Sequence, residues 1–139
     1  MDRHLQREWV VKILYQLDFE HCQLPKIDQI LENHGLTEKK DTDFIFTSID
    51  SIMANLDEID GLLRSKSFSR AFDRIPKIDK AILRASVNEF MIQKTVPVSI
   101  SINEAVEIAK KYSNAESFKY INGILSALAK DMTKEEKND

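Results

Sequence analysis

The sequence predicts an all-α domain of about six or seven helices. Glycine and proline, the residues that most disfavour a helix interior, occur only three times each in 139 residues. Apolar residues recur at intervals of three and four along most of the chain, the spacing that gives a helix one buried face. No internal repeat and no linker interrupts this pattern, which indicates a single domain.

Length and composition indicate a globular protein of the cytoplasm. Hydrophobic residues make up 42% of the chain and charged residues 31%, an ordinary mixture for a domain that needs no disulfide or metal. The single cysteine, Cys22, excludes an intramolecular disulfide and fits a reducing compartment. Charges interrupt residues 1–20, unlike a secretory signal, and no apolar run approaches the ~18 residues that cross a membrane.

The first half of the chain is predicted to hold three helices. Residues 3–19 form the first. Pro25 and Gly35 bracket a short second one, because proline is favoured at the first turn of a helix and glycine just after its end. The third begins at a cap among residues 41–43. Its apolar positions are spaced by 4, 3, 4, 3 and 4, and they are Ile45, Ile49, Ile52, Leu56, Ile59 and Leu63. Such a seam packs against another helix at a shallow angle.

A wide apolar surface predicts that the segment after Pro76 is the central helix. Its apolar residues are Ile78, Ile82, Leu83, Ala85, Val87, Phe90 and Met91. Pro97 is expected to end this helix, and residues 66–75 to form a short helix before it. Residues 96–102 alternate between apolar and polar, but a lone strand would have no partner, so we expect an extended link there.

Two S-x-x-E sequences predict the starts of the last two helices. Ser101 with Glu104 and Ser113 with Glu116 match the capping box, in which the serine oxygen accepts a hydrogen bond from an amide of the first turn.

These two helices would cover residues 102–112 and 114–130, which leaves 131–139 as a frayed tail of a domain that spans 1–130. Gly123 inside the last helix costs about 1 kcal/mol relative to alanine. It indicates either the close approach of a neighbouring helix or simple tolerance.

The charges are unevenly distributed around a net charge of −3. Residues 18–61 carry a net charge of −8, residues 64–84 carry +5 and residues 110–130 carry +3. An acidic protein can therefore still present a basic face to phosphates, since binding depends on the local field. The alternative is that these cations lie on solvated helix faces, mixed with charges from elsewhere.

No catalytic or metal-binding pattern is found in the sequence. His4, His21, His34 and Cys22 have no spacing that places two metal ligands on one helix face. His21 adjoins Cys22, but neighbouring side chains on a helix point about 100° apart. The acidic residues at 57–60 indicate a solvated face. We therefore expect a binding protein that is not an enzyme and uses no cofactor.

Two clusters combine basic and aromatic residues, as sites for unpaired nucleotides do. Guanidinium groups fit phosphates and aromatic rings stack on bases. The predicted RNA-binding residues are Arg3, Arg7 and Tyr15 in the first helix and Lys110, Lys111, Lys119 and Tyr120 in the last two. The alternative for each tyrosine is a place in the core or at its rim.

Four blocks of the sequence resemble the NusB family of bacterial transcription antitermination factors. They are RE and LYQ within residues 7–16, ID-x-x-ILR-x-x-x-x-E at 78–89, VP-x-x-x-x-INEAVE-x-AK at 96–110 and S-x-KY-INGIL at 117–125. The resemblance covers nearly the whole chain. It implies an all-α fold of two small, packed helical bundles.

The resemblance also implies a function and partners. NusB proteins bind the boxA element of nascent transcripts together with the ribosomal protein NusE, and they act with other Nus factors and RNA polymerase in ribosomal RNA operons. The resemblance implies RNA contacts from Arg3, Arg7, Tyr15, Lys119 and Tyr120. It implies that the turn around Ile78 and Asp79 lies at the junction of NusE and RNA.

The chain departs from the family pattern at its N-terminus, where His4 and Leu5 occupy positions at which arginine is frequent. Ser113 and Asn114 stand where many relatives have a glycine, and both suit a turn. Two alternatives remain open. One is a NusB-like domain associated with a ribosomal RNA methyltransferase, and the other is a homodimer that hides the RNA-binding face.

Overall fold

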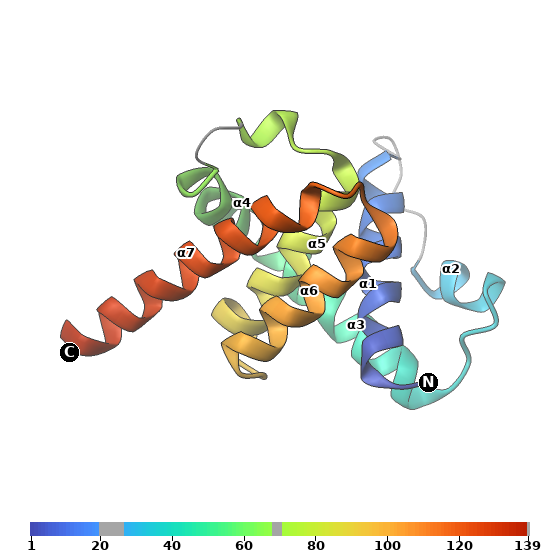
Figure 1. Cartoon of the computed structure of the whole chain (residues 1–139). Helices are drawn as coiled ribbons and strands as arrows, with labels where there is room; N and C mark the ends of the chain where they lie inside the picture. The colour runs from blue at the N-terminus through green and yellow to red at the C-terminus, as the bar shows by residue number, and fades with distance from the viewer. Residues whose placement is uncertain (20–26, 68–70, 139) are drawn as a thin grey trace.

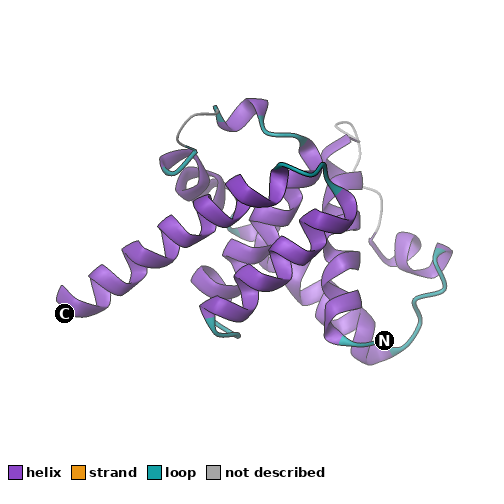
Figure 2. Cartoon of the chain, in the orientation of Figure 1, coloured by secondary structure: helices purple, strands orange, loops and turns teal. Residues whose placement is uncertain are grey.

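The computed structural model of the chain describes residues 1–19, 27–67 and 71–138, so Cys22, His21 and Pro25 lie outside the described residues. Within these ranges the protein is all-helical without a strand, as predicted (Figures 1 and 2). The α-helices described are α1 (Arg3–Phe19), α2 (Ile27–Asn33), α3 (Lys39–Ala54), α4 (Leu56–Ser65), α5 (Lys77–Val87), α6 (Val98–Tyr112) and α7 (Ser117–Asn138). A 3₁₀ turn, η1 (Phe72–Arg74), precedes α5, and a π-helical turn, η2 (Asn88–Gln93), continues it.

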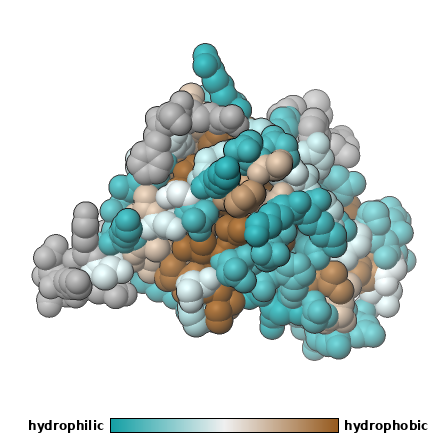
Figure 3. Space-filling view, in the orientation of Figure 1, coloured by the Kyte–Doolittle hydropathy of each residue, from teal (hydrophilic) through white to brown (hydrophobic). Residues whose placement is uncertain are grey.

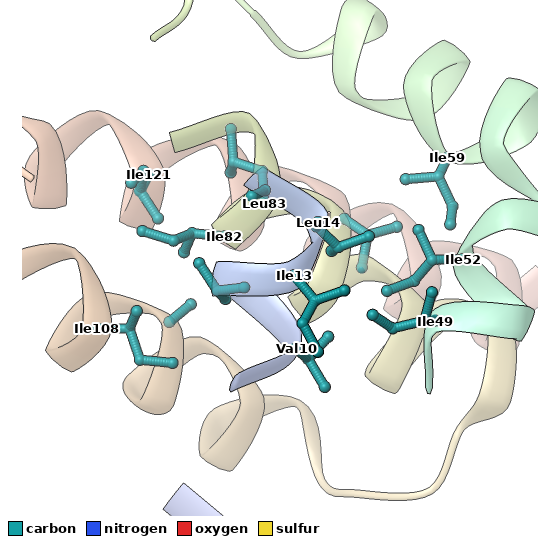
Figure 4. Close-up of a cluster of buried hydrophobic side chains, with 14 of the residues drawn as sticks. Val10, Ile13, Leu14, Ile49, Ile52, Ile59, Ile82, Leu83, Ile108 and Ile121 are labelled. Carbon is teal, nitrogen blue, oxygen red and sulfur yellow. The ribbon is translucent and has the colours of Figure 1, made fainter. Parts of the chain in front are cut away.

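Helix α5 is the central helix, as its apolar surface predicted. It contacts α1, α3, α4, α6 and α7. Its Ile82 and Leu83 are at most 1% exposed, and complete burial of such a side chain contributes about 1.5–3 kcal/mol. In Figure 4, the labelled residues of α1 and α5 occupy the middle of the core, with those of α3 on one side and those of α6 and α7 on the other. Helix α3 on one side and helices α6 and α7 on the other therefore share one core.

The long third helix predicted from the seam of isoleucines is in fact two helices. Asn55 separates α3 from α4, and its side-chain amide donates a hydrogen bond to the Ser51 carbonyl at 2.7 Å. An asparagine side chain that bonds locally to the backbone competes with helix continuation. Helix α3 also starts earlier than predicted, at Lys39. The buried Asp41 is not its cap but accepts a hydrogen bond from Gln6 at 2.7 Å.

The predicted link before α6 is helical instead. Helix α6 begins at Val98, directly after Pro97, since proline suits the start of a helix. Ser101 therefore lies inside the helix rather than at its cap. It is buried, and its hydroxyl is 2.8 Å from that of Ser86 on α5. Pro97 also does not end the central helix. That helix passes into η2 and ends before Lys94, which has the left-handed conformation with φ 55°.

Helix α7 begins and ends later than predicted. The Asn114 side chain accepts hydrogen bonds from the backbone amides of Glu116 and Ser117, both at 3.1 Å. Asn114 is therefore the capping residue, in place of the predicted Ser113. At the other end, α7 continues past Lys130 to Asn138, and its last turns extend away from the other helices (Figure 1).

Gly35 and Gly123 differ in backbone conformation, because Gly35 has a positive φ and Gly123 lies within a regular helix. Gly35 follows α2 with φ 72°, and the amides of Gly35 and Leu36 bond to the carbonyls of Glu32 and Leu31 at 3.0 and 2.8 Å. This is the glycine-terminated helix end that the sequence predicted. Gly123 is exposed inside α7, and no atom lies within 4 Å of the place an alanine Cβ would take. The structure therefore favours tolerance over close helix approach at Gly123.

We predict that Gly123→Ala stabilises the protein by about 0.5–1 kcal/mol, because alanine lowers the entropy of the unfolded chain and fits without a clash. Urea denaturation of both proteins measures this difference. Gly35→Ala is the matched control and should destabilise by about 1 kcal/mol, because a side chain disfavours positive φ. A loss of stability in Gly123→Ala would mean that this position is more crowded than the structure indicates.

Candidate functional site

The two N-terminal arginines have different surroundings. Arg3 is exposed, and its guanidinium lies 4.0 Å from the centre of the Phe44 ring on α3. The Arg7 side chain is 11% exposed, because its Nε lies 2.9 and 3.1 Å from the two carboxylate oxygens of Glu89. Its Nη1 is also 3.8 Å from Glu104. Arg3 can therefore meet a ligand directly, whereas Arg7 holds α1 against η2 and α6.

Glu8 is a buried carboxylate between α1 and α6. Lys111 Nζ lies 2.8 Å from its Oε1, and the Tyr112 hydroxyl donates to the same oxygen at 2.6 Å. His4 Nε2 lies 3.4 Å from its Oε2. Burial alone raises the pKa of Glu8, but the hydrogen bonds from Lys111 and Tyr112 outweigh it and hold this pKa below its ordinary value.

Lys111, one of the predicted RNA contacts, is thus paired within the protein. Its hydrogen bond to Glu8 raises the pKa of the Lys111 ammonium above its ordinary value. The neighbouring Lys110 points elsewhere. It forms an exposed pair with Glu107 at 3.5 Å, and its ammonium lies 5.2 Å from the centre of the Phe118 ring. The two lysines therefore do not act as one cluster.

Asp79, which the resemblance places at the junction with the partner, has no exposed surface in the structure. Its carboxylate accepts hydrogen bonds from the hydroxyls of Ser113 at 2.6 Å, Ser117 at 3.0 Å and Tyr120. A buried carboxylate requires such partners, because its loss of water is otherwise costly. Asp79 therefore fixes the turn between α6 and α7 against the start of α5. Ile78 beside it is half-buried against the core.

Lys119 and Tyr120 do not share a face, although the sequence suggested one cluster. The Lys119 side chain is 66% exposed and lies 3.4 Å from Glu116. The Tyr120 ring is half-buried against the core, and its hydroxyl faces Asp79. Adjacent residues on a helix point about 100° apart, which explains the separation. Tyr15 on α1 is likewise half-buried against the core.

A groove of about 560 Å³ lies between α6 and α7. It is lined by Ser99, Ile102, Asn103, Val106, Lys110, Phe118, Lys119 and Asn122. Figure 3 shows apolar surface between the more polar exposed residues of these helices. The sequence predicted Lys110 and Lys119 as ligand contacts, but not Phe118. It gave no sign that Asn103 and Asn122 would lie beside them, because they belong to different helices.

Cations of the basic segment at 64–84 contact groups within the protein. Arg84 forms a forked ion pair with Asp60 on α4, at 2.8 and 2.9 Å. The Phe72 ring lies 4.7 Å from Arg64, 4.7 Å from Lys80 and 5.8 Å from Arg84. These contacts favour the alternative, in which the cations of this segment are mixed with charges from elsewhere in the chain.

The described ranges contain neither a candidate membrane span nor a candidate metal site. None of the helices there is both long and apolar enough to cross a bilayer. Likewise, no three histidine, cysteine or acidic side chains in those ranges are grouped so that they could hold a metal ion.

We predict that the Glu8 pair stabilises the protein at neutral pH and loses this effect in acid. Because folding lowers the pKa of Glu8 from its ordinary 4.5, the stabilisation is present above that pH and disappears as pH falls through the lowered value. Thermal melting of the native protein and Glu8→Gln between pH 7 and about pH 3 tests this. The stability gap should close on acidification.

Glu107→Gln is the matched control for this experiment, because Glu107 forms an exposed pair with Lys110 on α6, the helix that carries Lys111. This variant should melt close to the native protein at every pH, since exposed pairs contribute little. A Glu8→Gln gap that stays constant in acid would contradict a lowered pKa.

Comparison with known proteins gives a consistent result. The sequence profile described as the NusB family matches residues 4–130. The "Transcription antitermination protein NusB" of Thermoanaerobacter sp. (strain X514) is 46% identical over 140 residues, with 98% of this chain and 96% of the relative covered. The protein of the same name from Ruminiclostridium cellulolyticum is 35% identical, with coverages of 94% and 90%.

Solved structures have the same fold. The structure of T. maritima NusB superposes with a TM-score of 0.83 at 32% identity and covers 94% of this chain and 92% of its own. A chain from a crystal structure of antitermination factors NusB and NusE in complex with dsRNA gives a TM-score of 0.81 at 24% identity, with coverages of 94% and 99%. At that identity the likeness concerns the fold alone. The family profile and the full-length relatives together show that the chain belongs to the NusB family.

Proposed function

We propose that the protein is a transcription antitermination factor. It binds boxA-type single-stranded RNA together with the ribosomal protein NusE and promotes elongation through ribosomal RNA operons. The observation that carries this proposal is the 46% identity, over 98% of the chain, with a protein named for transcription antitermination. The same fold occurs in a NusB that was crystallised with NusE and dsRNA, which supports RNA and NusE as the ligands to test first.

The surroundings of the seven predicted RNA-binding residues support two roles. Arg3, Lys110 and Lys119 are exposed and would meet phosphates directly. Arg7, Tyr15 and Tyr120 would support that surface from within, because their polar groups or rings contact the protein. The Lys111 side chain is 56% exposed, but its ammonium is held by the buried Glu8. For NusE we propose a contact at Ile78, which is half-buried at the start of α5, with Asp79 behind it as the residue that fixes the local backbone.

The protein would act by binding alone, without catalysis, as one component of a complex that includes other Nus factors and RNA polymerase. Local charge supports RNA binding despite the net charge of −3, because the exposed Lys110 of α6 and Lys119 of α7 both line one groove. The methyltransferase-associated domain and the inhibitory homodimer remain alternatives. Light scattering with and without RNA tests the homodimer, which should dissociate when RNA binds.

The proposal predicts sequence-specific RNA binding that depends on NusE. A gel shift with a boxA RNA and a scrambled RNA, each with and without NusE, measures it. We expect the boxA RNA to bind more tightly than the scrambled one, and NusE to increase the difference. If both RNAs bind equally in the presence of NusE, the protein does not read boxA and the proposal fails.

A second prediction concerns electrostatics at Lys119. Lys119→Gln should reduce the slope of log affinity against log salt by about 0.7, the value for one phosphate contact to a single strand. Lys40→Gln is the matched control, because Lys40 is 67% exposed and pairs with Glu38, much as Lys119 is 66% exposed and pairs with Glu116. Equal slopes for both variants would remove Lys119 from the interface.

A further inference from the structure

We infer that the groove between α6 and α7 is a binding site for an unpaired nucleotide, with the Phe118 ring as the surface on which its base stacks. This inference rests on the proposed RNA-binding function and names a site within it. Phe118 is not among the RNA contacts predicted from the sequence. We name Phe118 because it lines the groove together with Lys110 and Lys119.

The groove combines apolar and basic groups, and a nucleotide requires both. Ile102, Val106 and Phe118 give it apolar surface, which suits the face of a base. Lys110 and Lys119 are 51% and 66% exposed, so both ammonium groups can reach a phosphate. A single-stranded nucleic acid offers groups that match both, since its flat apolar bases alternate with charged phosphates.

Two exposed amides add the capacity to bind base edges. Asn103 on α6 and Asn122 on α7 both line the groove, one from each wall. An asparagine amide offers two donors and an acceptor, and it can therefore bond to the paired donor and acceptor on the edge of a base. The volume of about 560 Å³ falls within the usual range for ligand sites of small molecules.

The existing contacts of the two lysines do not block this role. Lys110 and Lys119 pair with Glu107 and Glu116 at 3.5 and 3.4 Å, and exposed pairs of this kind are weak. The Lys110 ammonium lies 5.2 Å from the centre of the Phe118 ring. A flexible lysine side chain can turn from the ring to a phosphate when a base takes its place.

Phe118 and Tyr120, the aromatic residue that the sequence favoured, are both half-buried, but they differ in what holds them. The hydroxyl of Tyr120 is held by the buried Asp79, at the junction of α5 and α7. Phe118 carries no polar group that fixes it, and it lines the groove, which Tyr120 does not. The stacking surface in this part of the molecule is therefore Phe118.

The test is fluorescence anisotropy of a labelled boxA RNA with the full-length protein, alone and with NusE, across a salt series. Phe118→Leu keeps an apolar side chain but removes the flat ring, and it should weaken binding about 5- to 100-fold. The salt slope should stay unchanged, because no charge is lost. Phe118→Trp keeps an aromatic ring and should bind RNA about as well as the native protein. The fluorescence that this variant adds to the signal of the native Trp9 should be quenched when RNA stacks on the new ring.

Controls separate stacking from folding. Phe46→Leu alters another half-buried phenylalanine on α3, which contributes no residue to the groove, and it should bind RNA like the native protein. If Phe118→Leu melts at a lower temperature, Asn122→Asp is the decisive variant, because it changes only an exposed side chain. The added negative charge in the groove should weaken RNA binding, whereas Asn33→Asp on α2 should not.

Native affinity in Phe118→Leu, with a reduced salt slope in Lys119→Gln, would overturn the inference and leave the proposed function intact. Loss of affinity only when NusE is present would assign the groove to a protein partner and also overturn it. Failure of the native protein to distinguish boxA from scrambled RNA would overturn both proposals.

Discussion

The carboxylate of Asp79 joins the parts of the molecule on which its candidate interface depends. It lies at the start of α5, without exposed surface, and accepts hydrogen bonds from Ser113, Ser117 and Tyr120. Leaving such a carboxylate without donors would cost several kcal/mol, so the turn between α6 and α7 has little freedom to move. That turn sets how α7 lies along α6, and therefore sets the groove between them.

The need to pair buried carboxylates also divides the predicted RNA-binding cations into two groups. Arg7 and Lys111 neutralise the buried carboxylates Glu89 and Glu8, which tie α1 to η2 and to α6. Removing either cation would leave a buried negative charge, and such losses are more damaging than the pair is stabilising. Arg3, Lys110 and Lys119 do not neutralise a buried carboxylate, because Arg3 lies against the Phe44 ring and the two lysines pair with exposed carboxylates. A basic residue in this family pattern can thus serve RNA binding indirectly, by holding the helices that present the exposed cations.

The sequence predicted the helices and the core well, because amphipathic spacing reflects burial directly. The seam of isoleucines is buried, and the segment after Pro76 is central. Helix ends were predicted less well, since they depend on tertiary partners. Ser101 and Ser113 have the sequence of capping residues, but their hydroxyls bond to Ser86 and Asp79 instead. The candidate site was predicted only in part for the same reason, because a groove lined by Asn103 and Phe118 exists only once α6 and α7 are packed.

Few of the proposed RNA contacts are exposed cations without a buried partner, which constrains how the protein would recognise RNA. If Arg3, Lys110 and Lys119 each neutralise one phosphate, the salt slope for single-stranded RNA is only about −2. His4 adds little to this, because it is held between Glu8 and Glu104, and Leu5 is an exposed apolar residue. Electrostatic attraction of that size gives weak binding with no preference for sequence. Under the proposed function, tight and specific binding then requires stacking, contacts to base edges and a second protein, and the proposed site, with one aromatic ring and two amides, would supply the first two.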